Sequence, residues 1–395
     1  MKILVIHQVP YRKIQYHLGI DHDRHDVTYV GMPDRMADLP ADLPCRRIVL
    51  DADQDMVEGI IGRTSPSDGY REVLALSEFG ILEAWHVRRH LGLDGPTWEQ
   101  LQLVRDKVRM KQALAASDVR YPRFVPAPAS IADIHWDGRT VIKPRQGASS
   151  EGVTIHDTAA AAFTAYRKLD DRLDFQLEEY IEGEILHADG LVSDSELVNV
   201  VVSQYVGRPV DFVTGEPLGS HQIQCTDQHR EFIVAVLEAL QIDNGCLHLE
   251  FFETPDGELV FLEVANRMGG AGVVDAHLRH TGVHLPTHEI AIRLGLPRPE
   301  PEQPTGRFHG WMAFPGHHLD RNQHLSIAVP PHLPAADWVD FLHIRQGTEK
   351  MPAHVSYQEW EVPVFVEGSH FASDRLRAHL KQFAQDVAVR MVRKA

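Results

Sequence analysis

The sequence predicts a protein that combines α/β and α+β organisation over three domains, residues 1–96, 97–300 and 301–395. Three observations predict this class. The chain opens on the apolar run MKILVI, which is typical of a first buried strand, and continues with alternating strand and helix patterns. The segment Gly245 to Gly272 has the pattern of a β-hairpin. The proline-rich stretch Pro297 to Gly306 separates that part from a last piece with several strands and a closing helix.

The first domain is predicted to be a small α/β unit. Further strands are expected near Val27–Gly31 and Arg47–Leu50, followed by a helix near Ile81–Leu91. Turn residues between Gly92 and Thr97 end this domain, and a helix over Pro96–Ser117 begins the next. Helices are also expected at Ala159–Leu169, Glu231–Leu240 and Asp374–Arg393.

The predicted hairpin sets two carboxylates against each other. With Asp256 and Gly257 as a two-residue turn, Glu250 lies directly opposite Glu263, and directly opposed Cβ atoms are about 4.5–5.5 Å apart. A turn centred on Pro255-Asp256 makes the two glutamates diagonal neighbours instead. Like charges at either separation repel unless a cation or a proton intervenes. Oxygen-only sites suit hard cations, so Mg²⁺ is expected here, with Mn²⁺ as a substitute.

A second segment, TVIKPRQGASSEGVTI, has the composition of a phosphate-binding loop. A β-rich run ends at Lys143, and Arg145 follows two residues later. The loop after it contains Gly147, Ser149 and Ser150, whose small side chains let backbone N–H groups turn toward an anion. The segment lacks the GxxxxGK[ST] pattern, which disfavours a P-loop fold.

Between these two segments lies FQLEEYIEGEILHADGLV, an extended apolar run from Phe175 to Val192 that is interrupted by acidic residues. Glutamates beside a strand edge can bind the hydroxyl pair of a ribose, and backbone groups there can bind an adenine edge. The helix over Pro96–Ser117 adds one more cation, Lys107. Together these segments predict a nucleotide site.

The order of these segments along the chain carries a family resemblance. Lys107 on a helix, Lys143 with its loop, EEYIEGE from Glu178 to Glu184, and then Glu250 and Glu263 follow each other as they do in ATP-grasp enzymes. The chain resembles carboxylate–amine ligases of that superfamily. LALSEFGILEAW, RDKVRMK and LEVANRMGG are most similar to bacterial L-amino-acid ligases and carnosine-synthase-like proteins. The resemblance implies an ATP-grasp fold, preceded by a Rossmann-like domain and followed by a small C-terminal α+β domain.

The resemblance also implies roles for individual residues in ATP binding. Lys107 and Lys143 match lysines that hold the α- and β-phosphates, and the loop after Lys143 matches one that folds over the phosphates. Glu178 to Ile181 matches the hinge whose backbone binds adenine, and Glu184 takes the place of the ribose ligand. The implied ATP-binding residues are Lys107, Lys143, Gly147, Ser149, Ser150, Glu178, Glu179, Tyr180, Ile181 and Glu184.

The metal and the activated carboxylate are assigned in the same way. Glu250 and Glu263 match glutamates that bridge magnesium. The family's Glu-x-Asn pattern is displaced by one residue here, so Asn266 becomes the third implied metal ligand. Arg267, with Gly269 and Gly270, matches the element that holds the carboxylate substrate.

The reaction that the resemblance implies is an ADP-forming ligation through an acyl phosphate, with an amino acid among the substrates. Lys143, Arg145 and Arg267 are expected to offset the charge that builds on the transferring phosphoryl group. The candidates for the base that deprotonates the amine, and for contact with the substrate, are His187 and Asp189. His248 also falls within the predicted cleft.

Two other readings stay open on the sequence alone. The same motifs fit a carboxylase or a purine-pathway ligase that uses bicarbonate or formate. The displaced asparagine also allows a protein that binds ATP without turning it over.

Composition sets the remaining expectations. A net charge of −17 argues against nucleic acid as a partner, because phosphate backbones attract basic surfaces. The 3 cysteines have no CxxC spacing, which indicates neither a disulfide framework nor a zinc site. No leader or membrane-spanning run is evident, so a cytoplasmic protein with small-molecule carboxylate and amine substrates is expected. A homodimer is the default expectation for its assembly.

Overall fold

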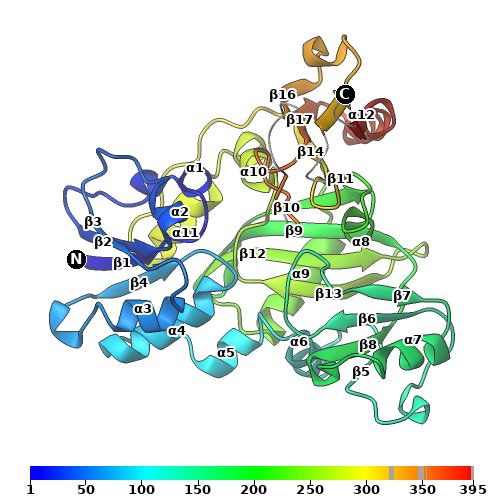
Figure 1. Ribbon diagram of the computed structural model, residues 1–395, viewed down its shortest axis with the longest axis horizontal. Helices are drawn as coiled ribbons and strands as arrows, with labels where there is room; N and C mark the ends of the chain where they lie inside the picture. The colour runs from blue at the N-terminus through cyan, green and yellow to red at the C-terminus, as the bar shows by residue number, and fades with distance from the viewer. Residues whose placement is uncertain (320–323, 346–350, 353, 393–395) are drawn as a thin grey trace.

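The computed structural model describes residues 1–319, 324–345, 351–352 and 354–392. In Figure 1 the N-terminal region lies at the left, the central sheets lie in the middle and at the lower right, and the C-terminal strands lie at the top. None of the helices in the described ranges is long and apolar enough to cross a membrane.

The N-terminal region is a parallel four-stranded sheet in the order β3-β2-β1-β4. Its strands are β1 (Lys2–Ile6), β2 (Asp26–Gly31), β3 (Arg46–Val49) and β4 (Glu72–Ala75), and its helices are α1 (Tyr11–Ile14), α2 (Pro33–Met36), α3 (Met56–Ile61) and α4 (Gly80–Leu91). Residues 3–6 of β1 are at most 1% exposed, which is typical of a parallel strand covered on both faces. The expected Rossmann-like α/β unit is confirmed, with β4 as a strand that the sequence did not predict.

The predicted helix over Pro96–Ser117 is in fact two helices, α5 (Trp98–Gln102) and α6 (Lys107–Leu114). The break occurs because the Asp106 carboxylate accepts a hydrogen bond of 2.9 Å from the backbone N–H of Val108 and so starts a new helix. Lys107 is therefore the first residue of α6.

A small antiparallel sheet follows, in the order β5-β8-β6-β7. It contains β5 (Phe124–Pro126), β6 (Thr140–Pro144), β7 (Thr154–His156) and β8 (Phe175–Glu179), with α7 (Ala159–Tyr166) packed beside it. Lys143 lies at the end of β6, and Glu178 lies at the end of β8. The loop between β6 and β7 contains the predicted phosphate-binding residues.

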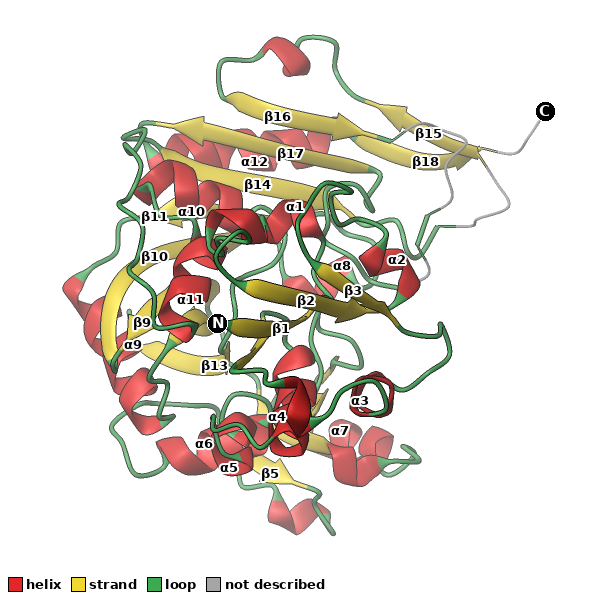
Figure 2. Cartoon of the chain, turned by 90° about the vertical axis from the view of Figure 1, so that its left-hand side faces the viewer, coloured by secondary structure: helices red, strands yellow, loops and turns green. Residues whose placement is uncertain are grey.

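The largest element is an eight-stranded sheet in the order β13-β12-β9-β10-β11-β14-β17-β16. Its strands are β9 (Glu184–Ser193), β10 (Glu196–Val206), β11 (Leu218–Ile223), β12 (Gly245–Glu253), β13 (Leu259–Ala265), β14 (Phe308–Phe314), β16 (Val339–Ile344) and β17 (Val364–His370). Figure 2 shows β14, β17 and β16 side by side at the top. Strands from before and after residue 300 therefore belong to one sheet. The domain limits at residues 96 and 300 stay predictions.

Helices cover this sheet and connect its strands. They are α8 (Pro209–Phe212), α9 (Asp227–Ala239), α10 (Val273–Thr281), α11 (Leu285–Arg293) and α12 (Ser373–Asp386). Leu247, Leu249 and Phe251 of β12 are 0% exposed and belong to the same core cluster as residues of α9. The alternate residues of β12, His248 and Glu250, point to the other face of the sheet.

The hairpin places Glu250 opposite Glu263, as the sequence predicted. The loop between the two strands differs from both turns that the sequence allows. The backbone N–H of Gly257 bonds the carbonyl of Thr254 at 2.9 Å, and Gly257 has φ +82°, so the loop contains three residues, Pro255 to Gly257. A register shift after Glu250 then compensates for the longer loop.

The C-terminal helix was predicted too long. It ends at Asp386, and Ala388–Val392 forms β18, which pairs with β15 (His324–Ala328) in a separate two-stranded sheet. Valines in this stretch favour a strand because a helix restricts the rotamers of β-branched side chains more than a strand does. Arg393, the last residue of the predicted helix, lies outside the described residues.

The core on the α9 side of β12 gives a stability prediction. We expect Leu249→Ala to lower the free energy of unfolding by about 2–5 kcal/mol, because it empties space around a fully buried side chain. The matched change Leu173→Ala removes a side chain that is 69% exposed and is expected to cost less than about 0.5 kcal/mol. Equilibrium urea denaturation measures both, and equal shifts in the midpoint would contradict this account of the core.

Candidate functional site

Two cavities meet beside the β12–β13 hairpin. The first lies between the small sheet and the large one and includes Lys143, the hinge segment and Phe252. The second extends toward β4, α10 and β14 and includes Glu78, Arg267 and Trp311. The residues that line both are Lys107, Ala148, Ser150, Pro209, Glu250 and Glu263. The predicted metal ligands therefore stand at the junction of the two cavities.

Each of the two glutamates has a cationic neighbour. Lys107 Nζ is 3.3 Å from Glu263 Oε2. His248 Nε2 is 3.5 Å from Glu250 Oε1, which also accepts a hydrogen bond of 2.7 Å from the Tyr205 hydroxyl. Burial alone would raise the pKa of Glu250, but the hydrogen bond and charge of His248, aided by Tyr205, lower it to about 2. Each carboxylate thus has a positively charged group within 4 Å.

A buried ion cluster fixes the second predicted phosphate ligand. Lys143 Nζ is 3.0 Å from Glu178 Oε2, and Lys111 Nζ is 2.5 Å from Glu178 Oε1. Burial would raise the pKa of Glu178, but Lys111 and Lys143 together lower it. Burial also lowers the pKa of Lys111 to about 8. This cluster of two ammonium groups and one carboxylate thus holds Lys143 at the wall of the first cavity.

The loop after β6 closes over the junction between the cavities. Ser149 and Ser150 have φ values of 60° and 56°, in the left-handed region that non-glycine residues rarely adopt. The Lys107 ammonium donates to the carbonyl of Gly147 at 3.1 Å, and the Tyr357 hydroxyl donates to the carbonyl of Ser149 at 3.5 Å. The loop is therefore tied to α6 on one side and to the C-terminal region on the other.

Glu178, Glu179, Tyr180 and Ile181 all line the first cavity, next to this loop. The backbone N–H of Glu179 bonds the carbonyl of Arg123 at 2.9 Å, and that of Tyr180 bonds the carbonyl of Arg139 at 3.0 Å. These two N–H groups are therefore used within the protein. The predicted backbone contacts with adenine can come only from the remaining groups of the segment.

Two of the residues predicted beside the nucleotide, Arg145 and Glu184, do not line either cavity. Arg145, expected beside the phosphates, places its guanidinium 2.5 Å from Asp106, where it braces the start of α6. Glu184, expected beside a ribose, lies 3.1 Å from Arg377 of α12. In both cases an oppositely charged partner on another element sets the direction of the side chain.

Asn266 is also placed away from the paired glutamates. Its side-chain amide donates to the carbonyls of Asn244 and Cys246 at 3.1 and 2.8 Å, and its oxygen accepts from Arg293 at 3.3 Å. Successive side chains on a strand point to opposite faces, and the one-residue displacement turns this one toward α11. These contacts correct the expectation that Asn266 is a metal ligand.

Arg267 lies in the second cavity within a chain of alternating charges. Its Nε and Nη2 atoms donate to Glu78 Oε2 at 3.0 and 2.7 Å, and Arg105 forms an ion pair with the other oxygen of Glu78. Burial would raise the pKa of Glu78, but the two arginines lower it. Glu78 thus holds Arg267 in one orientation, with its Nη1 donating to the carbonyl of Met268 at 2.8 Å.

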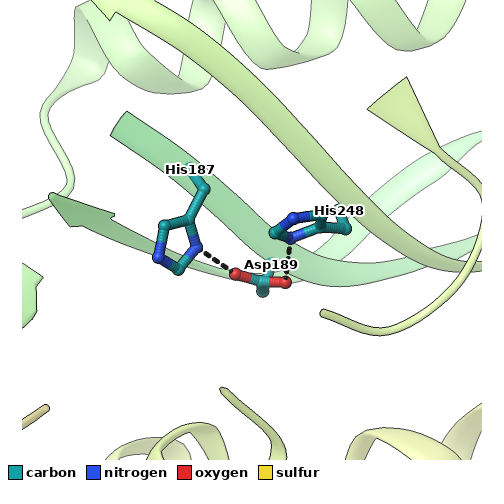
Figure 3. A group of neighbouring side chains, drawn as sticks. All are labelled: His187, Asp189 and His248. Atoms are coloured by element: carbon teal, nitrogen blue, oxygen red, sulfur yellow. Dashed lines mark hydrogen bonds and ion pairs between the residues drawn. The ribbon is translucent and has the colours of Figure 1, made fainter. Parts of the chain in front are cut away.

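Three further polar residues form a buried cluster, and Figure 3 shows His187 and His248 both directed at Asp189. Nδ1 of His187 donates to Asp189 Oδ2 at 2.6 Å, and Nδ1 of His248 donates to Oδ1 at 2.8 Å. Nε2 of His187 is 2.7 Å from the Ser220 hydroxyl. His187 and Asp189, predicted to contact substrate, are at most 2% exposed and do not line the second cavity, whereas His248 does.

Gly269 and Gly270 both line the second cavity but differ in their surroundings. A Cβ atom on Gly269 would lie 2.4 Å from Asp189 Oδ1 and 3.0 Å from His248 Nδ1. A Cβ atom on Gly270 would meet nothing within 4 Å. The backbone at Gly269 therefore packs directly on the buried cluster, and the backbone at Gly270 borders open space.

Three charged residues that hold predicted site residues in place were missed in the sequence. Lys111 lies one turn after Lys107 on α6, and its place on the same face as Val108 was the available signal. Glu78 and Arg105 lie in segments that carry the family resemblance, but no local pattern marks them as partners of Arg267. Their roles follow only from contacts between distant parts of the chain.

Comparison with known proteins agrees with this arrangement. Residues 104–271 match the family model described as ATP-grasp domain. The L-arginine-specific L-amino acid ligase of Bacillus subtilis is 24% identical over 220 residues, which are 52% of this chain and 53% of that protein. The chain thus matches about half the length of this curated relative.

Solved structures match over the whole chain. The L-amino acid ligase from Bacillus licheniformis has a TM-score of 0.73 and 18% identity, over 100% of this chain and 98% of that one. Phosphoribosylglycinamide synthetase from Anaerococcus prevotii has a TM-score of 0.66 and 13% identity, over 100% of this chain and 99% of that one. The fold is therefore the ATP-grasp fold with flanking N- and C-terminal regions.

The two glycines beside Arg267 give a matched test of the geometry. We expect Gly269→Ala to lower the free energy of unfolding by about 1–3 kcal/mol, because the added methyl group overlaps the buried cluster. Gly270→Ala is expected to leave it unchanged or to raise it by less than about 1 kcal/mol. Thermal and urea denaturation compare the two variants, and equal losses would argue against the close packing at Gly269.

The buried cluster also predicts a pH dependence of stability. Burial would lower the pKa of His248, but Asp189 and Glu250 raise it to about 10. Its stabilising contribution is therefore complete below about pH 6.5, the unfolded value, and is lost as the pH rises through about 10. In magnesium-free buffer the wild type should lose stability over this range by about 1.4 kcal/mol per pH unit more than His248→Gln. Parallel profiles in urea denaturation at pH 6 to 10 would contradict this assignment.

Proposed function

We propose that this chain, which carries an ATP-grasp domain, is an ADP-forming carboxylate–amine ligase with an amino acid among its substrates. The observation that carries the proposal is the junction of two cavities at Glu250 and Glu263. One cavity has lysines and a loop suited to phosphates, and the other has an oriented arginine suited to a carboxylate. A metal at the junction would contact groups bound on both sides.

The residues at the junction suit MgATP. Glu250 and Glu263 offer carboxylate oxygens on paired strands, which is the donor set that a hard divalent cation takes. Lys107 and Lys143 line the first cavity and suit its phosphates, with Ser150 beside them. A bound magnesium ion would supply charge neutralisation between the phosphates. Glu179 to Ile181 would hold the base against the apolar wall of that cavity.

In the proposed reaction, an oxygen of the substrate carboxylate attacks the γ-phosphorus of ATP and ADP leaves. The amine nitrogen then attacks the carbonyl carbon of the acyl phosphate, phosphate leaves, and the amine loses a proton. Arg267, held by Glu78, would orient the carboxylate and offset its charge. Lys143 would offset the charge that develops on the phosphates.

His248 is better placed to act on the amine than His187 or Asp189, because it lines the second cavity. Both of its ring nitrogens face carboxylates, which accept hydrogen bonds but do not donate them. His248 would therefore be an imidazolium that positions groups, and the proton would have to pass to solvent or phosphate. The loop at Ser149 and Ser150 would exclude water from the acyl phosphate.

The experiment measures ADP and phosphate release with MgATP, with amino acids offered singly and in pairs. We expect turnover that needs a pair and a product with the mass of a dipeptide. Glu263→Gln should lower kcat/KM by about 100-fold or more, since it removes a metal-binding charge of the junction. The matched control Glu238→Gln, an exposed position on α9, should keep full activity.

Other outcomes separate the remaining readings. Turnover that needs bicarbonate or formate in place of a second amino acid would favour a carboxylase or a purine-pathway type of ligase, in line with the similar fold of phosphoribosylglycinamide synthetase. ATP binding in calorimetry without ADP release in any mixture would favour a protein that has lost catalysis.

A further inference from the structure

The second cavity has an apolar arm that the proposed chemistry leaves unused. Tyr205, Leu218, Ala271, Val273 and Trp311 line it, and each of these side chains is at most 9% exposed. We name this part of the cavity the aromatic arm. Trp311 comes from β14, outside the residues that match the ATP-grasp domain model.

The aromatic arm begins next to the point where the activated carboxylate would lie. The Tyr205 hydroxyl is 2.7 Å from Glu250, which places its ring beside the junction. The Trp311 side chain lies 2.9 Å from the Cβ position of Gly272, just after the segment that borders Arg267. A carboxylate bound by Arg267 between these contacts would direct the rest of its molecule into the arm.

The negatively charged side chains of the second cavity are all paired with positively charged ones. Three carboxylates line it, and each has a cationic neighbour among the described residues. Glu78 contacts Arg105 and Arg267, Glu250 contacts His248, and Glu263 contacts Lys107. Magnesium bound to the two junction glutamates would further reduce the negative charge that is available to pair with a substrate cation. A guanidinium side chain entering this cavity would therefore find no free carboxylate on its lining.

Physical chemistry then separates two classes of substrate. Burying a cation without a partner is strongly unfavourable, because the charge loses its hydration. Burying an apolar side chain in the same place is favourable in proportion to the area removed from water. Rings and branched side chains also suit contact with Tyr205 and Trp311.

We propose that the amino acid whose carboxylate is activated has an apolar side chain of leucine to phenylalanine size, bound in the aromatic arm, and that arginine is excluded. This inference rests on the ligase function proposed above. It separates the chain from the similar Bacillus subtilis protein, which is an L-arginine-specific ligase.

The test compares donors at saturating MgATP with alanine as the common partner. Leucine, methionine, phenylalanine, arginine and glutamate are offered in turn, ADP release is measured, and tandem mass spectrometry reads which residue donated its carboxylate. We expect kcat/KM for leucine or phenylalanine to exceed that for arginine by about 100-fold. Arginine used equally well or better would overturn the inference and leave the ligase function standing. Absence of turnover with every pair would remove the ligase function and the inference with it.

A pair of variants at one position isolates charge from shape. Ala271 has φ +51°, a conformation that aspartate and asparagine tolerate better than most residues, and it lies in the arm. We expect Ala271→Asp to raise the ratio of arginine to leucine kcat/KM at least about tenfold above that of Ala271→Asn, because only the aspartate supplies a partner for a guanidinium. Equal ratios in the two variants would show that the donor side chain does not enter the arm.

A third variant keeps the test informative if both changes at Ala271 impair folding. A Cβ atom on Gly270 would meet nothing within 4 Å, so Gly270→Val adds volume on the side of the cavity that is open. The ratio of phenylalanine to alanine kcat/KM, with each as donor, should fall at least about tenfold. A ratio that stays at the wild-type value would also overturn the proposal. Melting temperature and MgATP affinity serve as the controls for folding in all three variants.

Discussion

The opposition of Glu250 and Glu263 across one strand pair is the constraint on which the rest of the site depends. Two carboxylates in that position repel each other, so the fold must supply positive charge around them. Lys107 from α6 supplies it for Glu263, and His248 supplies it for Glu250. Asp189 in turn holds His248, and His187 holds Asp189. One pair of charges thus dictates the polar residues on several neighbouring strands.

The local charge of the site contrasts with that of the whole molecule. The chain carries a net charge of −17, whereas the first cavity sets the cations Lys107, Lys143 and Arg208 among five glutamates. Glu178 forms ion pairs with the ammonium groups of Lys111 and Lys143, which holds Lys143 at the cavity wall. A polyanion would therefore be repelled by most of the surface, and in this cavity it would meet the ammonium groups of Lys107 and Lys143.

The sequence predicted the elements of the fold better than the directions of individual side chains. Three of the four strands of the first sheet and the pairing of the two glutamates follow from local patterns that the packing preserves. Glu250 still pairs with Glu263 although the loop is one residue longer than the simplest turn, because a bulge restores the alignment. Order along the chain, rather than any one motif, indicated the ATP-grasp domain that residues 104–271 match.

Side chains whose direction depends on distant partners could not be predicted in this way. Arg145 turns to Asp106 and Glu184 turns to Arg377, and neither partner is marked by local spacing. Lys111 would ordinarily be a solvated lysine on a helix, but it is buried because Glu178 arrives from β8. A charged residue finds its place through the tertiary fold, and a single sequence does not show which opposite charge will be nearest.

The unbroken large sheet has a mechanical consequence. β12, which carries Glu250, and β14, which carries Trp311, are strands of one hydrogen-bonded surface, whereas Lys143 belongs to the separate small sheet. Residues 180–183 are the direct backbone link from β8 in the small sheet to β9 in the large one. A rotation of the small sheet about that link would widen or narrow the first cavity. Glu250 and Trp311 would keep their positions relative to each other. The proposed nucleotide site is thus shared between the two sheets, whereas Glu250 and Trp311 belong to one.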